Sequence, residues 1–226
     1  VILLDILDGS MIISRMLAHS LASQGTDACI MTLPYYGKRK PQAIKERMKL
    51  NEDMTVFVNA VHQAVGDVRR TARWLAGQDT IDTDNIGICG TSLGGFVAAL
   101  SAGVDGQFSR AAFLLAGGDL AAVLSTDAKE IRGIRKEIEK RGLDENQLKE
   151  LLSSIEPLNF SDRLSNTKIL MINGSNDTIV PPTCAEKLAE SAGTQIQWYA
   201  TDHYGMAKYL LPVISKICMH FNAENW

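Results

Sequence analysis

The chain has 226 residues, which suits one α/β domain with a sizeable core. Hydrophobic residues make up 46% of the chain and charged residues 22%, which excludes a disordered protein and a coiled coil. The formal net charge of −3 argues against a nucleic-acid partner, because binding to phosphates needs a basic surface. We therefore expect a single domain spanning residues 1–226 that acts on a small molecule.

The apolar runs are too short to cross a bilayer, so no membrane span is expected. No signal peptide is visible, but the sequence begins at Val1 inside an apolar run, so its start could be missing. The cysteines are widely spaced, form no CxxC pair and are expected to be free, buried thiols. They are Cys29, Cys89, Cys184 and Cys218. Free thiols favour a reducing compartment, and we expect the cytoplasm.

Apolar patterns along the chain predict strands that alternate with helices. Strands are expected at 1–4, 27–34, 85–90, 110–118, 167–174 and 194–200. Helices are expected at 11–25, 51–77, 93–103, 182–193 and 205–221. Parallel neighbours need long crossovers, so this alternation predicts a mostly parallel central sheet with helices on both faces, a three-layer α/β fold.

Residues 119–160 interrupt the alternation with charge-rich helical sequence and no evident strand. Two interpretations stay open. The segment is either a solvated pair of helices inserted between two strands, or a small cap over the carboxyl ends of the strands, where α/β sheets hold their ligands.

The segment CGTSLGGF, residues 89–96, lies between a predicted strand and a predicted helix. It is not a phosphate-binding P-loop, because Phe96 occupies the position of the required lysine. It does match GxSxG, with Gly90 and Gly94 on either side of Ser92. A serine at so sharp a turn needs small neighbours two positions away, and a helix N-terminus favours developing negative charge. Ser92 is therefore predicted to be a nucleophile.

A serine nucleophile needs a base and an acid, which follow it in the order Asp or Glu, then His. His203 comes after the last predicted strand, whereas His220 falls within the last helix and is expected to be a packing or surface residue. Asp177 follows the strand at 167–174 and is the predicted acid, with Asp202 as the alternative. The predicted catalytic residues are Ser92, Asp177 and His203.

These motifs give the chain a resemblance to the α/β-hydrolase superfamily, nearest to its dienelactone-hydrolase-like and prolyl-oligopeptidase-like esterase branches. The matching segments are DVRRTARWLAGQDTIDTDNIGICGTSLGGFVAAL (67–100), ILMINGSNDTIVPP (169–182) and TDHYG (201–205). The resemblance implies a Ser92–His203–Asp177 triad, an α/β-hydrolase fold and hydrolysis without metal or cofactor. Dienelactone hydrolases themselves use a cysteine nucleophile, so the serine argues against that activity.

An oxyanion hole in such a protein uses backbone N–H groups. Leu93, directly after Ser92, is expected to supply one of them. The second should come from the loop after the first strand, where Asp5-Ile6 stands in place of the usual His-Gly. Leu7 is the expected donor and Ile6 the alternative, unless Asp8-Gly9 forms the turn.

Tyr35 and Tyr36 follow the second predicted strand, so they could contact substrate or simply belong to an exposed loop. We expect a serine hydrolase that cleaves a carboxylic ester through an acyl-enzyme. The alternatives are a peptidase or thioesterase of the same fold, and a non-catalytic binding protein with an impaired oxyanion hole. A peptidase of the prolyl-oligopeptidase kind would need a gating domain that 226 residues do not accommodate.

Overall fold

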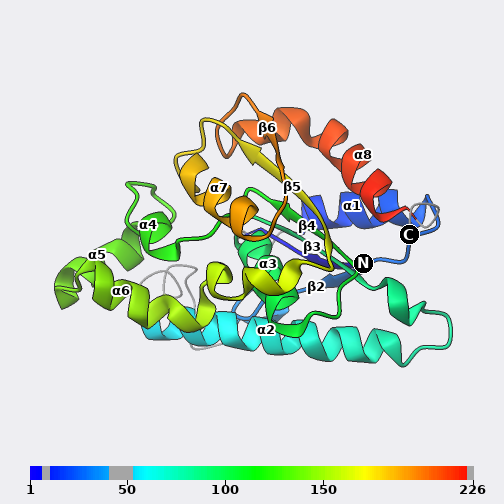
Figure 1. Ribbon diagram of the computed structural model, residues 1–226, viewed down its shortest axis with the longest axis horizontal. Coiled ribbons are helices and arrows are strands. Elements are labelled where there is room, and N and C mark those ends of the chain that lie inside the picture. The colour runs from blue at the N-terminus through cyan, green and yellow to red at the C-terminus, as the bar shows by residue number, and fades with distance from the viewer. Residues whose placement is uncertain (7–10, 41–52, 223–226) are drawn as a thin grey trace.

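A computed structural model of the chain describes residues 1–6, 11–40 and 53–222. It contains a six-stranded sheet in the order β2-β1-β3-β4-β5-β6, and every neighbouring pair is parallel (Figure 1). The strands are β1 (Ile2–Leu4), β2 (Cys29–Met31), β3 (Gly87–Thr91), β4 (Arg110–Leu114), β5 (Lys168–Gly174) and β6 (Ile196–Tyr199). The predicted α/β architecture is confirmed.

The register of the central strands brings their carboxyl ends to one edge of the sheet. Thr91 of β3 pairs with Leu114 of β4, which in turn pairs with Ile172 of β5. The residues that follow these strands therefore leave the sheet side by side. This edge is where open parallel sheets form their ligand sites.

Helices cover both faces of the sheet and complete three layers (Figure 1). One face carries α1 (Ile12–Ala22) and α8 (Leu210–Phe221). The other face carries α2 (Met54–Ala76), α3 (Leu93–Asp105) and α7 (Pro182–Ser191). Strand side chains alternate between the two layers: Ile2 and Leu4 of β1 belong to the α2/α3 core, and Leu3 belongs to the α1/α8 core.

The predicted helix over 205–221 is in fact two elements, η6 (Gly205–Tyr209) and α8. The backbone at Tyr209 has φ −105° and ψ 13°, which is not helical. Pro212 explains the break, because proline has no N–H and clashes with the carbonyl four residues before it. It is tolerated only in a first helical turn, and α8 begins two residues before it.

The 119–160 insert forms short helices between β4 and β5, at the carboxyl end of the sheet and away from the labelled chain ends in Figure 1. Its helical elements are α4 (Leu120–Leu124), α5 (Arg132–Arg141), α6 (Glu145–Leu152), η4 (Ser153–Ile155) and η5 (Pro157–Leu164), the last of which runs past the expected end of the insert. Ile134, Leu148 and Leu152 are buried in the α2/α3 core. Half-buried Glu156 accepts hydrogen bonds from the backbone N–H groups of Asp119 and Leu120 at the start of α4. The insert is therefore packed against the body of the domain.

The cysteines are free thiols, and all except half-buried Cys29 are buried. Burial raises the pKa of Cys89 to about 12 and that of Cys184 to about 11, so both are protonated near neutral pH.

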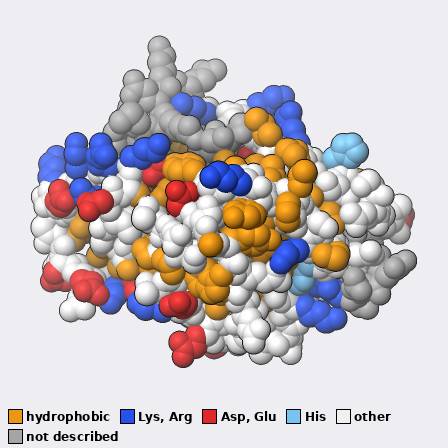
Figure 2. All heavy atoms as spheres, turned by 90° about the horizontal axis from the view of Figure 1, so that it is seen from above, with side chains coloured by type: hydrophobic (Ala, Val, Ile, Leu, Met, Phe, Trp, Pro, Cys, Tyr) orange, Lys and Arg blue, Asp and Glu red, His pale blue; other side chains and the backbone are white. Residues whose placement is uncertain are grey.

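On the surface, Figure 2 shows hydrophobic side chains gathered across the middle of the face seen from above. Among the described residues, the structure contains no helix that is both long and apolar enough to span a membrane.

Candidate active site

Ser92 is the single residue that joins β3 to α3. Its φ of 53° and ψ of −119° fall outside the regions that L-residues ordinarily adopt. Its N–H donates to the carbonyl oxygen of Leu114 at 2.8 Å, which ties the turn to the end of β4. Such strained geometry is typical of a nucleophile elbow, because it exposes the serine hydroxyl above the sheet.

Glycines allow this turn to form. A Cβ at Gly90 would collide with the carbonyl of Gly94, and a Cβ at Gly94 would collide with the carbonyl oxygen of Leu4. The sequence pattern predicted both requirements. A third glycine, Gly95, lets α3 approach the end of β4, since a Cβ there would lie 2.9 Å from the carbonyl oxygen of Leu114.

The three predicted catalytic residues form one hydrogen-bonded chain. Nε2 of His203 lies 3.0 Å from Oγ of Ser92, and Nδ1 of His203 lies 2.6 Å from Oδ2 of Asp177. The side chain of Asp177 is fully buried and that of His203 is 11% exposed. With a proton on Nδ1, the ring donates to the carboxylate and accepts from the serine hydroxyl, the arrangement that a general base requires.

Backbone groups hold the carboxylate of Asp177 in place. Its Oδ1 accepts from the N–H groups of Ile179 at 2.8 Å and Val180 at 2.9 Å, which leaves Oδ2 for the histidine. The loops that carry the acid and the base are also joined, because Asn176 N–H donates to the carbonyl of Thr201 at 3.0 Å. The relative placement of acid and base is therefore set by main-chain contacts.

Asp202, the alternative acid, has a different role. Its Oδ1 accepts from the N–H of Gly205 at 2.6 Å, at the start of η6. Because neighbouring residues direct their side chains apart, the carboxylate of Asp202 shapes the turn after His203. The structure therefore brings Asp177, and not Asp202, to the imidazole.

His220 is remote from this chain of residues. Its Nε2 lies 3.1 Å from the carbonyl oxygen of Ala111 in β4. Burial, together with the charge of Arg110, lowers the pKa of His220 to about 4, so the ring is neutral at physiological pH. It is a packing residue, in line with the sequence-based expectation.

The oxyanion donors are only partly described. Leu93 is the first residue of α3, so its N–H has no acceptor within the helix and lies beside Ser92. Leu7, Asp8 and Gly9 lie outside the described residues. Ile6, the alternative donor, is half-buried and lines the cavity next to Ser92.

Asp5 has a structural role that the sequence did not suggest. It is 4% exposed, and its carboxylate accepts from Met11 N–H at 2.7 Å and from Ser14 Oγ at 2.9 Å. These bonds join the end of β1 to the start of α1. An acid directly after a buried aliphatic strand was the available signal, because a buried carboxylate needs partners. Asp5 follows Leu4, whose carbonyl oxygen lies so close to Gly94 that a Cβ there would collide with it. The junction between β1 and α1 therefore packs against the turn that carries Ser92.

A cavity of about 670 Å³ opens onto Ser92 and His203. Most of its lining side chains are aliphatic or aromatic, and several come from the insert, including Leu124 and Ile134. Tyr35 and Tyr36 are not among the described residues that line it. Tyr36 is buried in the α2/α3 core and Tyr35 packs against that core, so the structure places neither where substrate contact was expected.

A polar cluster bridges the insert and the histidine loop at the cavity wall. The hydroxyl of Tyr204 donates to the carboxylate of Glu130. The ammonium group of Lys129 lies 5.2 Å from the centre of the Tyr204 ring, a cation–π distance. All three residues line the cavity, and the charge-rich insert sequence gave no sign of this pairing.

The sequence model of the prolyl oligopeptidase family matches residues 59–202, a range that includes Ser92 and Asp177 and ends directly before His203. The chain belongs to this family. Two uncharacterized proteins of Mycobacterium tuberculosis are each 27% identical to this chain over 183 residues. The alignments cover 80% of the chain and 43% of each relative, so the chain spans less than half the length of the curated relatives it matches.

Several solved structures share the fold of this chain. Acetyl xylan esterase from Paenibacillus sp. R4 superposes with a TM-score of 0.73 at 18% identity, covering 95% of this chain and 73% of the esterase. A putative dienelactone hydrolase from Klebsiella pneumoniae gives 0.64, also at 18% identity, with 98% and 85% of the two chains covered. These likenesses establish an α/β-hydrolase fold.

Proposed function

We propose that this protein is a serine hydrolase that cleaves a carboxylic ester, with Ser92, His203 and Asp177 as its catalytic triad. The supporting observation is the continuous chain of hydrogen bonds from Asp177 through His203 to Ser92 at the wall of a largely apolar cavity. The names of the structural neighbours, an acetyl xylan esterase and a putative dienelactone hydrolase, fit ester cleavage.

In the proposed mechanism, Oγ of Ser92 attacks the ester carbonyl while Nε2 of His203 takes the hydroxyl proton. The buried carboxylate of Asp177 keeps the ring oriented and stabilises the imidazolium. The N–H of Leu93, with that of Leu7 or Ile6, stabilises the oxyanion. His203 then gives its proton to the departing alcohol. Water, deprotonated by the same His203, attacks the acyl-enzyme and releases the acid.

The test is labelling with a fluorophosphonate together with hydrolysis of p-nitrophenyl esters. Wild-type protein is expected to label at Ser92, and Ser92→Ala to lose both labelling and about 10⁶-fold in kcat. Ser101→Ala is a control on the same helix, because this serine is buried and does not line the cavity. Equal ester hydrolysis by wild type and Ser92→Ala would overturn the proposal, and so would a folded wild-type protein that does not label.

The family name makes a peptidase the second candidate. Amide and ester substrates with the same acyl group separate the two, because both would use the same triad. Prolyl p-nitroanilides and the matching p-nitrophenyl esters should be compared by kcat/KM. We expect cleavage of the esters and little of the anilides, since few described side chains in the cavity offer hydrogen bonds to a peptide backbone.

A further inference from the structure

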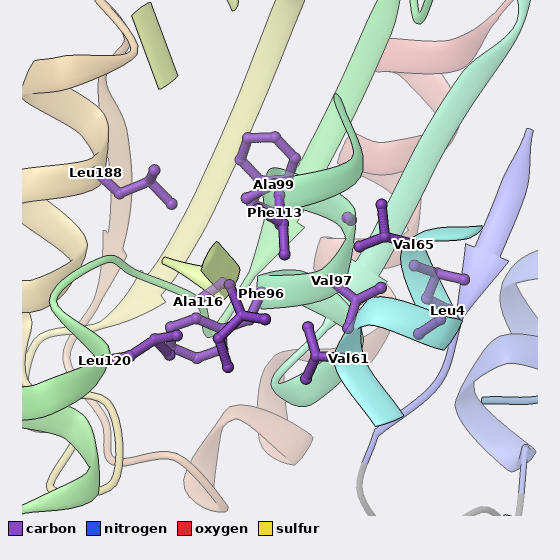
Figure 3. Packing of buried hydrophobic residues seen from close by; sticks show 14 of the residues in the cluster. Leu4, Val61, Val65, Phe96, Val97, Ala99, Phe113, Ala116, Leu120 and Leu188 are labelled. Atoms are coloured by element: carbon purple, nitrogen blue, oxygen red, sulfur yellow. The ribbon is translucent and has the colours of Figure 1, made fainter. Parts of the chain in front are cut away.

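The cavity draws its wall from both faces of the sheet. On one side lie Phe57 and Val61 of α2 and Val97 of α3, all members of the α2/α3 core. Figure 3 shows Val61 and Val97 among the packed side chains of that core. On the other side lie Leu17 of α1 and Val213 of α8, from the α1/α8 core. The two sides meet over the carboxyl ends of β3 and β4, so Ser92 stands between two apolar walls.

Polar groups are few on these walls. Besides Ser92 and His203, the polar side chains among the described lining residues are Thr91, Lys129, Glu130 and Tyr204. The last three already contact one another in the bridge between the insert and the histidine loop. A buried hydroxyl without a partner is unfavourable, so a sugar or other polyol would bind poorly against either wall.

We propose, resting on the ester hydrolysis proposed above, that the substrate is an ester whose acyl and alcohol groups are both apolar, one held against each wall. The leaving oxygen must receive its proton from Nε2 of His203. Met206 in η6, three residues after His203, and Leu210 at the start of α8 line the α1/α8 side of the cavity. The alcohol group therefore lies against the α1/α8 wall and the acyl group against the α2/α3 wall.

Two ester series test this. One holds p-nitrophenol constant and lengthens the acyl chain from two to twelve carbons. The other holds the acetyl group constant and lengthens the alcohol from methanol to octanol, followed by acid release. In each series kcat/KM is expected to rise about fourfold for every methylene that enters the cavity. A rise in only one series would overturn the proposal, as would faster cleavage of an acetylated sugar than of octyl acetate.

Two matched variants test which wall holds which group. Ile131 packs against the α2/α3 core and Leu210 against the α1/α8 core, and both are half-buried lining residues. Ile131→Trp should abolish the rise of kcat/KM with acyl length and leave the alcohol series unchanged. Leu210→Trp should abolish the rise of kcat/KM with alcohol length and leave the acyl series unchanged. Leu211→Trp, at a 71% exposed neighbour outside the cavity wall, should change neither. The reverse pattern, or an equal effect of both variants on both series, would overturn the assignment of the walls.

Failure of this proposal is distinguishable from failure of the proposed function. If Ser92 labels with fluorophosphonate but both ester series are flat, the protein is a hydrolase and the two-walled apolar substrate is wrong. If Ser92 does not label and no ester is cleaved, the proposed function fails and this inference falls with it. Melting temperatures of the tryptophan variants verify folding, and the wild-type series decide the substrate class without them.

Discussion

Asp177→Asn exchanges one oxygen of a buried carboxylate for an NH₂ group at nearly constant size. The amide oxygen can still accept from Ile179 and Val180, whose N–H groups now bind Oδ1 at 2.8 and 2.9 Å. The NH₂ group then faces Nδ1 of His203, where the carboxylate oxygen lies 2.6 Å away. It can only donate, so the ring proton moves to Nε2.

This change removes the base. With its proton on Nε2, His203 donates to Ser92 and cannot accept the hydroxyl proton. The loss expected from such a tautomer change is about 10⁴-fold in kcat, or about 5 kcal/mol of transition-state stabilisation. Stability should change little, because both backbone hydrogen bonds to the side chain remain.

The assay is kcat/KM on a p-nitrophenyl ester, with the rate of fluorophosphonate labelling and a thermal unfolding curve. Asp202→Asn is the matched control, since Asp202 is exposed and binds the N–H of Gly205. It should stay within about threefold of wild type. A folded Asp177→Asn variant that keeps more than about one tenth of the wild-type kcat/KM would show that Asp177 does not set the tautomer of His203.

Three further substitutions test the turn at Ser92, the junction of β1 with α1, and the half-buried ring of His220. Gly94→Ala should lower the free energy of unfolding by about 1–3 kcal/mol and slow the labelling of Ser92, because the new Cβ meets the carbonyl oxygen of Leu4. The control Gly66→Ala, at an uncrowded helix position, should stabilise the protein by about 0.5–1 kcal/mol. Equal urea midpoints for the two variants would contradict this. Asp5→Ala should cost about 2–4 kcal/mol by urea unfolding, because it strips the partners from Met11 N–H and Ser14 Oγ, and a cost below about 1 kcal/mol would show that those bonds contribute little. The pKa of His220 is lowered to about 4 in the folded protein, so the unfolded chain binds more protons between about pH 6.5 and pH 4 and stability falls as the pH falls through that range. Between pH 7 and pH 5, the free energy of unfolding of the wild type should fall by about 1–2 kcal/mol more than that of His220→Gln, a figure that allows for the partial exposure of the ring. Parallel profiles of stability against pH would refute this.

Local chemistry explains what could be predicted from the sequence. Alternating strand and helix patterns indicate a parallel sheet because parallel neighbours need long crossovers, and the six strands are where the apolar runs predicted them. GxSxG predicts the turn at Ser92 because so sharp a turn needs glycine two positions to either side, although the collision avoided at Gly94 is with the distant carbonyl of Leu4. Pro212 carried the information that splits the closing helix, but the long apolar periodicity of 205–221 obscured it.

Tertiary structure decided what depends on side-chain direction and on distant segments. The sequence favoured Asp177 over Asp202 as the acid, but the contact of Asp177 with His203 depends on the joined loops after β5 and β6. The bonds of Asp5 to Met11 and Ser14 likewise need the return of the chain into α1. The cavity is the clearest case, because its two apolar walls belong to helices on opposite faces of the sheet that meet only at its edge. The sequence thus determined the fold and the residues from which a triad could be built, and the packing of the layers decided which acid faces the histidine and what kind of space surrounds Ser92.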